Sequence, residues 1–326
     1  MKPSGDEVGA ALAAATRFLL AARQPDGWWV DMEILAHASD EYVSAYVAVR
    51  LAATGEPQAQ EAVSQTWQLL LGRRDPQDGW GWNPGRPTDA DSTAWGLRLA
   101  EHAGASNSPR AEAARRVLAR HQLPGGGVAC YRPGLFIPRP FEGWAIPHAC
   151  VTAGAAVLSD FRDGALEYLR QAQLPDGGWK AYWWCQPELV AALAAEAFVL
   201  AGNPYPQTLD RARSWAKGRL NARGAAATRE RPGGSPFATA ACLQTMLLAG
   251  EKLKPESAPS LALAWLLRSQ RADGSWSPSA QVRTPPHEAE DPDLDPKANV
   301  VAFDLNRTFT TATVLMALVL ARASGS

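Results

Sequence analysis

Two aspartates separated by one residue are the most chemically suggestive pair in the sequence. Asp89 and Asp91 lie in Thr88-Asp-Ala-Asp-Ser92, at the start of a run rich in Ala and Leu. A negative charge on one carboxylate favours the protonated form of the other, so the pair is expected to titrate as a coupled system. Aspartates at a helix start also act as N-caps. These residues alone leave two interpretations open, an acid–base pair and a structural cap.

A repeated phrase indicates which elements position this pair. Its copies share a Gln or Asp, a glycine turn and usually a tryptophan, and they recur about every 50 residues. The copies begin at Gln24, Asp75, Gln122, Gln173 and Gln270. The last interval is close to twice the others, which predicts a degenerate copy near Asn221-Ala-Arg-Gly224. A fixed period of this length indicates six repeated units.

Each phrase lies between two runs with helical character. The run before it is amphipathic, as in 8–23, and the run after it is apolar on nearly all sides, as in 188–201. A helix that is apolar all round is a buried helix. Six such pairs predict an all-α fold, an (α/α)6 double-ring barrel with six inner helices inside six outer ones. We expect residues 1–326 to form one such domain, because the repeat runs through nearly the whole chain.

Short connections place the aspartates at one end of this barrel. Successive helices joined by short loops run antiparallel, so every outer helix ends and every inner helix begins at the same rim. Asp89 and Asp91 begin the second inner helix, and the repeated phrases surround them at the same mouth. Most tryptophans of the phrases are expected to pack structurally between helices. The mouth is therefore the predicted place for a functional site.

The phrases resemble the QW repeats of the squalene–hopene cyclase and class II terpene cyclase superfamily, which also contains the β subunits of protein prenyltransferases. The resemblance covers about residues 8–323 and matches the size of one α/α barrel rather than two. Within it, the segment 88–95 is similar to the Asp-x-Asp-Asp-Thr-Ala signature of class II cyclases. The resemblance implies that Asp91 protonates an alkene or epoxide and that Asp89 tunes and orients it. Ser92 departs from the signature, which commonly has a third carboxylate there.

The activity implied by the resemblance is class II terpenoid cyclisation, an isomerase or intramolecular lyase reaction of a linear isoprenoid. A single barrel favours a C15 or C20 prenyl diphosphate or a prenylated aromatic. Two alternatives stay open. One is a non-catalytic isoprenoid-binding or scaffolding barrel, which Ser92 favours. The other is a prenyltransferase β-like subunit, although the Asp-x-Cys spacing of its zinc site is missing.

Aromatic residues and one histidine are predicted to surround the aspartates. A carbocation needs an aromatic cavity without water, because ring faces stabilise cations and water quenches them. The candidates, each of which also suits core packing, are Tyr42, Trp95, Phe136, Phe141, Trp144, Tyr182, Trp183, Trp184, Phe237 and Phe309. His148 begins the third inner helix, beside that of Asp91. It is expected either to hydrogen-bond the aspartates and return a proton to them or to bond only to backbone.

An acidic loop and several basic residues suggest a polar head group on the substrate. Within 285–297, Glu290-Asp291-x-Asp293 resembles the Mg²⁺-associated motifs of diphosphate-using cyclases, and Glu290 and Asp291 are the predicted Mg²⁺ ligands. The residues predicted to bind a diphosphate directly are Lys180, Arg229, Arg231, Lys297 and Arg307. A solvated run of charge is the alternative interpretation of the loop.

Composition excludes other classes of protein. The 32 Lys and Arg residues nearly balance 33 Asp and Glu, for a net charge of −1, and this is not the basic composition of a nucleic-acid-binding protein. No apolar run reaches the roughly 18 residues of a transmembrane span, and no signal peptide is recognised. We therefore expect a cytoplasmic protein whose partner is a small isoprenoid. Peripheral contact with a membrane is compatible with this composition, and the oligomeric state is left open.

Overall fold

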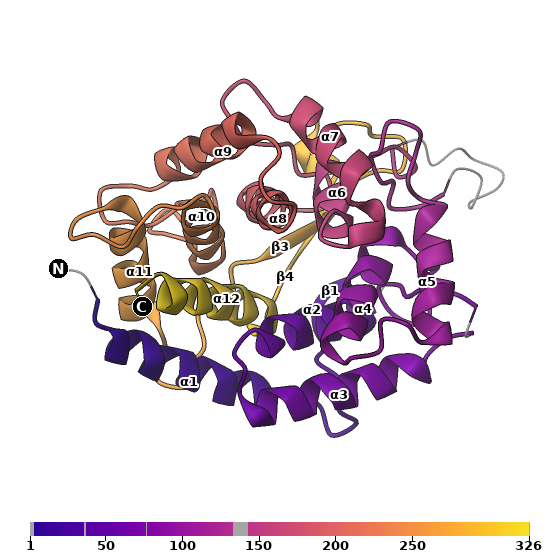
Figure 1. The fold of residues 1–326 in the computed structure, drawn as a ribbon, viewed down its shortest axis with the longest axis horizontal. Coiled ribbons are helices and arrows are strands. Elements are labelled where there is room, and N and C mark those ends of the chain that lie inside the picture. Colours follow the sequence, from indigo (N-terminus) through magenta and orange to yellow (C-terminus); the bar gives the residue numbers. More distant parts are fainter. Residues whose placement is uncertain (1–2, 36, 76, 133–142, 326) are drawn as a thin grey trace.

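The chain forms two concentric rings of helices in the computed structural model (Figure 1). The structure describes residues 3–35, 37–75, 77–132 and 143–325. The outer ring consists of α1 (Gly5–Ala21), α3 (Pro57–Leu71), α5 (Pro109–Ala119), α7 (Arg162–Ala172), α9 (Pro206–Gly218) and α11 (Ala258–Ser269). The inner ring consists of α2 (Glu41–Ala52), α4 (Ala90–His102), α6 (Ala149–Ala155), α8 (Glu188–Leu200), α10 (Pro236–Leu248) and α12 (Thr308–Gly325). The predicted (α/α)6 double-ring barrel is confirmed.

The two rings differ in burial as their sequence patterns predict. Every residue of α2 is buried, and all but one residue of α10 are. The outer helix α7 buries only Ala165, Leu166 and Leu169, which lie on one face of the helix. Burying a Leu or Phe side chain stabilises a fold by about 1.5–3 kcal/mol. The inner ring therefore supplies much of the stability that holds the mouth in shape.

The repeated phrases connect each outer helix to the next inner helix. In four of them the tryptophan indole N–H donates to the carbonyl oxygen of a leucine ten residues earlier in the outer helix. The donors are Trp29, Trp80, Trp179 and Trp276, with N···O distances of 2.7, 3.1, 2.8 and 2.8 Å. The structural role predicted for these tryptophans is thereby confirmed.

The glutamine of the last phrase closes the ring. Gln270 Nε2 donates to the carbonyl oxygen of Gly274 in its own loop and to that of Ala11 in α1, both at 2.9 Å. The degenerate copy near Asn221 keeps the turn without the tryptophan. Asn221 Oδ1 accepts from the backbone N–H of Ala225 at 3.1 Å, and Gly224 has the positive φ of +85° that glycine adopts readily.

The structure also contains two short β-hairpins at the mouth, whereas the sequence predicted helices alone. β1 (Asp31–Ile34) pairs with β2 (His37–Ser39), and β3 (Gln281–Thr284) pairs with β4 (Val300–Phe303), both antiparallel. Strands of three or four residues are too short to show a reliable alternation in sequence. β3 and β4 run across the middle of the ring (Figure 1). The connection between them is the acidic loop, which includes the 3₁₀ turn Pro296–Ala298.

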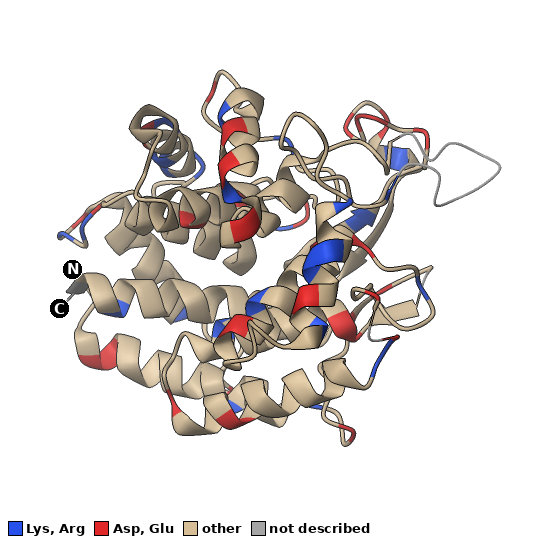
Figure 2. Ribbon diagram, turned by 45° about the vertical axis from the view of Figure 1, so that its right-hand side comes forward, with Lys and Arg blue, Asp and Glu red and all other residues tan. Residues whose placement is uncertain are grey.

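β3 is attached to the loop that precedes the inner helix α8 by a second set of backbone bonds. The Arg283 N–H donates to the Trp183 carbonyl oxygen at 2.8 Å, and the Cys185 N–H donates to the Gln281 carbonyl oxygen at 3.0 Å. The strand thus forms a wall above the N-termini of the inner helices. Charges of both signs are interspersed along the ribbon (Figure 2). Among the described residues, no helix combines the length and the apolar character that crossing a membrane requires.

Candidate active site

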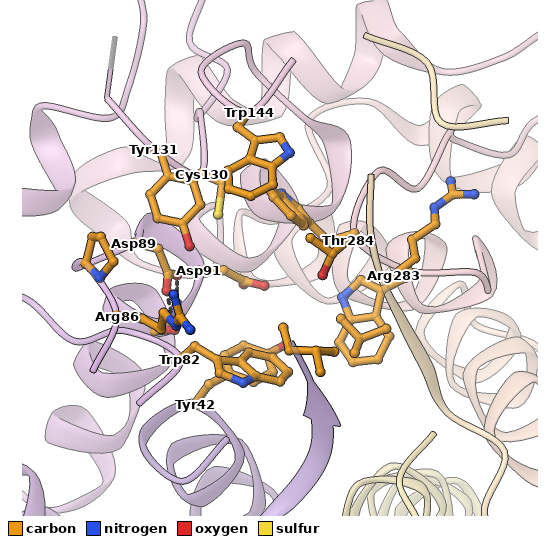
Figure 3. A pocket seen from close by; sticks show the side chains of 16 residues that line it. Tyr42, Trp82, Arg86, Asp89, Asp91, Cys130, Tyr131, Trp144, Arg283 and Thr284 are labelled. Atoms are coloured by element: carbon orange, nitrogen blue, oxygen red, sulfur yellow. Dashed lines mark hydrogen bonds between the residues drawn. The ribbon is translucent and has the colours of Figure 1, made fainter. Parts of the chain in front are cut away.

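A cavity opens at the mouth, between the N-termini of the inner helices and β3 (Figure 3). Its space amounts to about 820 Å³, with the open solvent at the mouth included. Two carboxyl groups, those of Asp89 and Asp91, lie on its wall. The aromatic side chains that line it are Tyr42, Trp82, Tyr131, Trp144, Trp183 and Trp184. Acidic and aromatic groups therefore face the same space.

The structure assigns different positions to the two aspartates. Asp89 is the N-cap of α4 and is buried, with Oδ1 accepting from the Ser92 N–H at 2.7 Å and Oδ2 from the Ser92 hydroxyl at 2.8 Å. Asp91 lies in the first turn, and its carboxyl group points into the cavity (Figure 3). The capping interpretation thus describes Asp89, whereas Asp91 is placed to meet a ligand. Ser92, at the position of the third carboxylate of the signature, donates two hydrogen bonds to Asp89.

The surroundings of Asp91 favour its protonated form. Burial raises the pKa of Asp91 to about 8, and the negative charge of Asp89 adds to the rise. The Tyr42 hydroxyl, the Arg98 guanidinium and the Trp95 indole N–H act in the opposite direction. Burial also raises the pKa of Asp89 to about 6, against the hydrogen bonds from Ser92. Near neutral pH the site therefore holds a protonated Asp91 beside an ionised Asp89.

Four of the predicted aromatic residues line the cavity, namely Tyr42, Trp144, Trp183 and Trp184. Phe237 and Phe309 are buried behind Trp184, with ring centroids 5.8 and 4.9 Å from its own. Phe237 and Phe309 therefore pack behind the cavity wall and do not line the cavity. Phe136 and Phe141 lie outside the described residues.

Two predicted aromatic residues point elsewhere. The Tyr182 hydroxyl donates to the Ala289 carbonyl oxygen at 2.6 Å, so this ring fastens the acidic loop to the barrel. Trp95 is 1% exposed and packs in the core below the cavity. Trp95 is a helical residue one turn after Asp91, and at that depth the barrel is filled with side chains.

Sequence reasoning missed two of the aromatic residues that line the cavity. Trp82 stacks on Tyr42 with ring centroids 5.9 Å apart, and Tyr131 tilts against Trp144 at 5.7 Å. Trp82 is the second tryptophan of Gly79-Trp-Gly-Trp82 and exceeds what the repeated phrase needs, a signal that was available. Tyr131 carries no comparable signal, because it lies in a loop outside any phrase.

His148 follows the second of its two predicted alternatives. Its Nε2 donates to the Gly143 carbonyl oxygen at 2.8 Å, and its ring stacks on Tyr182 at 3.6 Å. Burial lowers the pKa of His148 to about 4, so the ring is neutral near pH 7. His148 does not line the aromatic cavity, and a direct bond to the aspartates is not formed.

The five basic residues predicted to bind a diphosphate do not line the cavity. Arg307 pairs with Asp273 at 2.6 Å, and Arg231 donates to the Pro278 carbonyl oxygen at 2.6 Å. Lys180 pairs with Asp291. Arg229 and Lys297 are exposed on surface loops. Three of these cations thus already have partners within the chain. The other two are exposed on loops and do not line the cavity.

The acidic loop does not fit the predicted Mg²⁺ site. In the part of the chain that the structure describes, no three His, Cys, Asp or Glu side chains are grouped so that they could hold a metal ion. Asp291 is ion-paired with Lys180, and Asp293 with Arg283 at 2.5 Å. Mg²⁺ prefers oxygen ligands around an octahedron, whereas Asp291 and Asp293 are each neutralised by a basic side chain.

Comparisons with family models and with curated proteins gave no match for this chain. Solved structures do match. A variant of the type II terpene cyclase MstE from Scytonema, in complex with geranylgeranyl dihydroxybenzoate, is 38% identical with a TM-score of 0.91, over 98% of this chain and 99% of that one. Another MstE variant, in complex with the product merosterolic acid A, has the same identity and TM-score over 98% of both chains.

Two further structures extend the comparison. A protein from Actinoplanes is 38% identical with a TM-score of 0.89, over 96% of this chain and 99% of that one. The ent-copalyl diphosphate synthase from Streptomyces platensis is 21% identical with a TM-score of 0.62, over 86% of this chain and 50% of that one, and it shows the fold alone. The likeness to MstE extends over both chains almost completely, and the cavity combines a carboxyl group of raised pKa with aromatic walls. This chain belongs to the type II terpene cyclases.

Proposed function

We propose that the enzyme cyclises the isoprenoid chain of a prenylated aromatic acid, starting with a proton from Asp91. The observation that carries the proposal is the position of the Asp91 carboxyl group, which faces a cavity lined by six aromatic rings. Burial and the charge of Asp89 raise its pKa to about 8. The related cyclase MstE holds geranylgeranyl dihydroxybenzoate, a substrate of this class. The basic residues predicted for a diphosphate lie away from the cavity, which favours an aromatic head over a diphosphate.

In the proposed reaction, Asp91 Oδ–H transfers its proton to the distal C=C bond of the chain. A C–H bond forms, and the neighbouring carbon becomes a cation that the next C=C bond attacks to close a ring. Faces of Tyr42, Trp82 and Trp184 stabilise the moving positive charge. Loss of a proton from the last cation to solvent gives a product isomeric with the substrate, and a proton taken up from solvent restores the Asp91 carboxyl group. The hydrogen bonds from Ser92 keep Asp89 ionised and oriented beside Asp91.

Arg86 is the best-placed residue for the carboxylate of the aromatic head. It lines the cavity and is exposed, and no carboxylate or carbonyl group among the described residues pairs with its guanidinium. The other arginine of the wall, Arg283, is occupied, because it donates to the carbonyl oxygens of Ala181 and Tyr182 and pairs with Asp293. A guanidinium group binds a carboxylate through two parallel hydrogen bonds.

Replacing Arg86 by Gln is expected to raise KM for a prenylated benzoate roughly 10- to 100-fold, with little change in kcat. A hydrogen bond to a charged group contributes about 1.5–3 kcal/mol, and here it acts on binding rather than on the proton transfer. Steady-state kinetics would measure both constants. Arg229→Gln is the matched control, since Arg229 is exposed and does not line the cavity. Equal KM values for wild type and Arg86→Gln would remove Arg86 from substrate binding.

The substrate class is tested by incubating the protein with geranylgeranyl dihydroxybenzoate, farnesyl diphosphate and geranylgeranyl diphosphate. We expect only the aromatic substrate to give a product of unchanged mass with fewer alkene protons, detected by mass spectrometry and NMR. Faster turnover of either diphosphate would overturn the proposed head group. Asp91→Asn serves as the control for non-enzymatic cyclisation, because it keeps the cavity shape and lacks the acidic proton.

The same assay tests the metal prediction. Because Asp291 and Asp293 are paired with Lys180 and Arg283, turnover of the aromatic substrate is expected to be the same with EDTA as with added Mg²⁺. A loss of activity in EDTA that Mg²⁺ restores would return Glu290 and Asp291 to the metal-binding role predicted from sequence.

A further inference from the structure

A cluster of charged side chains lies in the core of the inner ring, below the cavity. It is called here the floor cluster and consists of Arg50 on α2, Arg98 on α4 and Glu196 on α8. Glu196 accepts from Arg98 Nη2 at 2.5 Å and from Arg50 Nη1 at 3.4 Å. Arg50 and Arg98 are only 2% and 3% exposed. Two guanidinium groups share one carboxylate, so the floor cluster has an excess positive charge in a setting where burial of charge is costly.

Two titratable neighbours, Glu101 and His102, bear on this charge. Glu101 attracts Arg98, but it is also attracted to Arg115 and Arg162. Burial and then Arg98 lower the pKa of His102, so that histidine is neutral near pH 7. Burial acts to raise the pKa of Glu196, but the two guanidinium groups outweigh burial and keep that pKa below its ordinary value. Glu196 therefore stays ionised, and within the floor cluster two guanidinium groups face one carboxylate. Arg50 Nε and Arg98 Nη1 are buried without a hydrogen-bond partner in the described part of the chain.

A column of side chains connects the floor cluster to the cavity. Asp91, Trp95 and Arg98 are spaced i, i+4 and i+7 along α4, which puts them on one face of the helix. Seven residues of helix rise about 10 Å, so this is the distance from the acid to the cluster along the axis. The Arg98 and Arg50 guanidinium carbons lie 4.1 and 4.9 Å from the centroid of the Trp95 ring.

Trp95 differs from the tryptophans of the repeated phrases. Their indole N–H groups donate to helix carbonyl oxygens, whereas Trp95 Nε1 is buried and makes no hydrogen bond of normal geometry to the described residues. Its N–H nevertheless lies close enough to Asp91 to lower the pKa of that carboxyl group. Two guanidinium groups flank its ring, so the ring is not available to a substrate cation. Cations against an indole draw electron density toward themselves and make the N–H a stronger donor.

We propose that the floor cluster, acting through Trp95, stabilises the Asp91 carboxylate that remains after proton transfer and so strengthens the acid. The inference rests on the proposed role of Asp91 as the proton donor. Arg50, Arg98, Glu196 and Trp95 are positioning residues, because they touch Asp91 or its neighbours and not the substrate. Fixed charges and dipoles that already point at the developing charge need no reorganisation during the reaction.

Other groups also face Asp91 from the elements packed around it. Asp89 approaches from the N-cap, Tyr42 from α2, Cys150 from α6 and Cys130 from the loop before it. Burial raises the pKa of both thiols and of the Tyr42 hydroxyl, so these three groups are neutral at working pH. Asp89 supplies negative charge, which opposes ionisation of Asp91. The floor cluster supplies positive charge, so removing one of its guanidinium groups is expected to shift the titration of Asp91 measurably.

Three variants separate an electrostatic role from a structural one. Arg98→Gln leaves Arg50 and Glu196 as a balanced pair, and the basic limb of the kcat/KM pH profile is expected to rise by about one pH unit, as for one charge roughly 10 Å away. Turnover at the optimum is expected to fall about tenfold. Arg98→Lys keeps the charge and should leave the limb in place. Glu196→Gln increases the positive charge and should move the limb to lower pH.

A second readout does not depend on the substrate. The infrared C=O band of protonated Asp91, identified by its loss in Asp91→Asn, is titrated in wild type, Arg98→Gln and Arg98→Lys. The midpoint is expected to rise by about one pH unit in Arg98→Gln alone. An unchanged midpoint in Arg98→Gln, or an equal shift in Arg98→Lys, would overturn the inference. If Glu196→Gln fails to fold, the two Arg98 variants decide alone. A shifted midpoint in an enzyme without turnover would instead reject the proposed function and keep the inference.

Discussion

Asp91→Asn is expected to lower turnover of the prenylated aromatic by at least about 10³-fold and to leave the fold intact. A general acid contributes about 10²–10⁴-fold in typical enzymes, and here the proton starts the reaction, so the effect lies at the upper end. The amide keeps the volume of the side chain and removes the proton. Product formation by mass spectrometry measures the loss, and circular dichroism reports on the helices.

Asp89→Asn is the matched control for that result. Asp89 accepts two hydrogen bonds from Ser92 and does not carry the transferred proton in the proposed reaction. Its replacement is expected to weaken activity less than replacement of Asp91 and to change stability little, because Asn caps a helix about as well as Asp. Turnover by Asp91→Asn at the wild-type rate would show that another group supplies the proton.

Asp91 is also expected to make the folded enzyme less stable as the pH rises. In the unfolded chain Asp91 ionises near its ordinary pKa of about 3.9, whereas in the fold it stays protonated up to a pH near 8. Between those values the folded state holds the extra proton, so the free energy of unfolding falls as pH increases, by up to about 1.4 kcal/mol per pH unit. Asp91→Asn lacks this proton and should be more stable than wild type above about pH 5.

Thermal unfolding at pH 5 and pH 8 checks this prediction. The Tm difference between Asp91→Asn and wild type should be larger at pH 8. The reason is that the free energy of unfolding of wild type falls over the whole range from pH 5 to pH 8, whereas Asp91→Asn has no such loss at this position. Asp89 contributes a smaller effect of the same sign, between its ordinary pKa and about 6. A Tm difference that is equal at both pH values would mean that Asp91 ionises normally in the fold.

The fold was predictable from the sequence because the signal is repeated. Six glycine turns at a constant period, each between an amphipathic and an apolar run, leave few arrangements other than two rings of helices. The same repetition placed Asp89 and Asp91 at the rim where inner helices begin, and the resemblance of 88–95 to the class II cyclase signature then singled out Asp91 as the acid. The hairpins of β1 and β3 escaped prediction because each occurs once and is three or four residues long.

The side chains that reach the cavity were harder to predict than their location. Topology puts Lys180, Arg231 and Arg307 near the mouth, but their direction depends on partners distant in sequence, such as Asp291 for Lys180. Likewise, Trp95 follows Asp91 by one helical turn and still points into the core. Arg86 attracts no attention in the sequence, since its significance arises from the absence of a partner in the described structure.

The hydrogen bond from Gln270 to Ala11 bears on how the protein folds. Open arrays of repeats hold only neighbour-to-neighbour contacts and can unravel from an end unit. Here the bond joins residues 259 positions apart, and α12 packs against α1 across the same seam. Closure therefore requires an encounter between distant parts of the chain, which slows folding, but once made it removes the end at which unravelling would begin. The barrel is expected to unfold in one cooperative transition, with Asp91 from an early unit and β3 from a late one losing their shared cavity together.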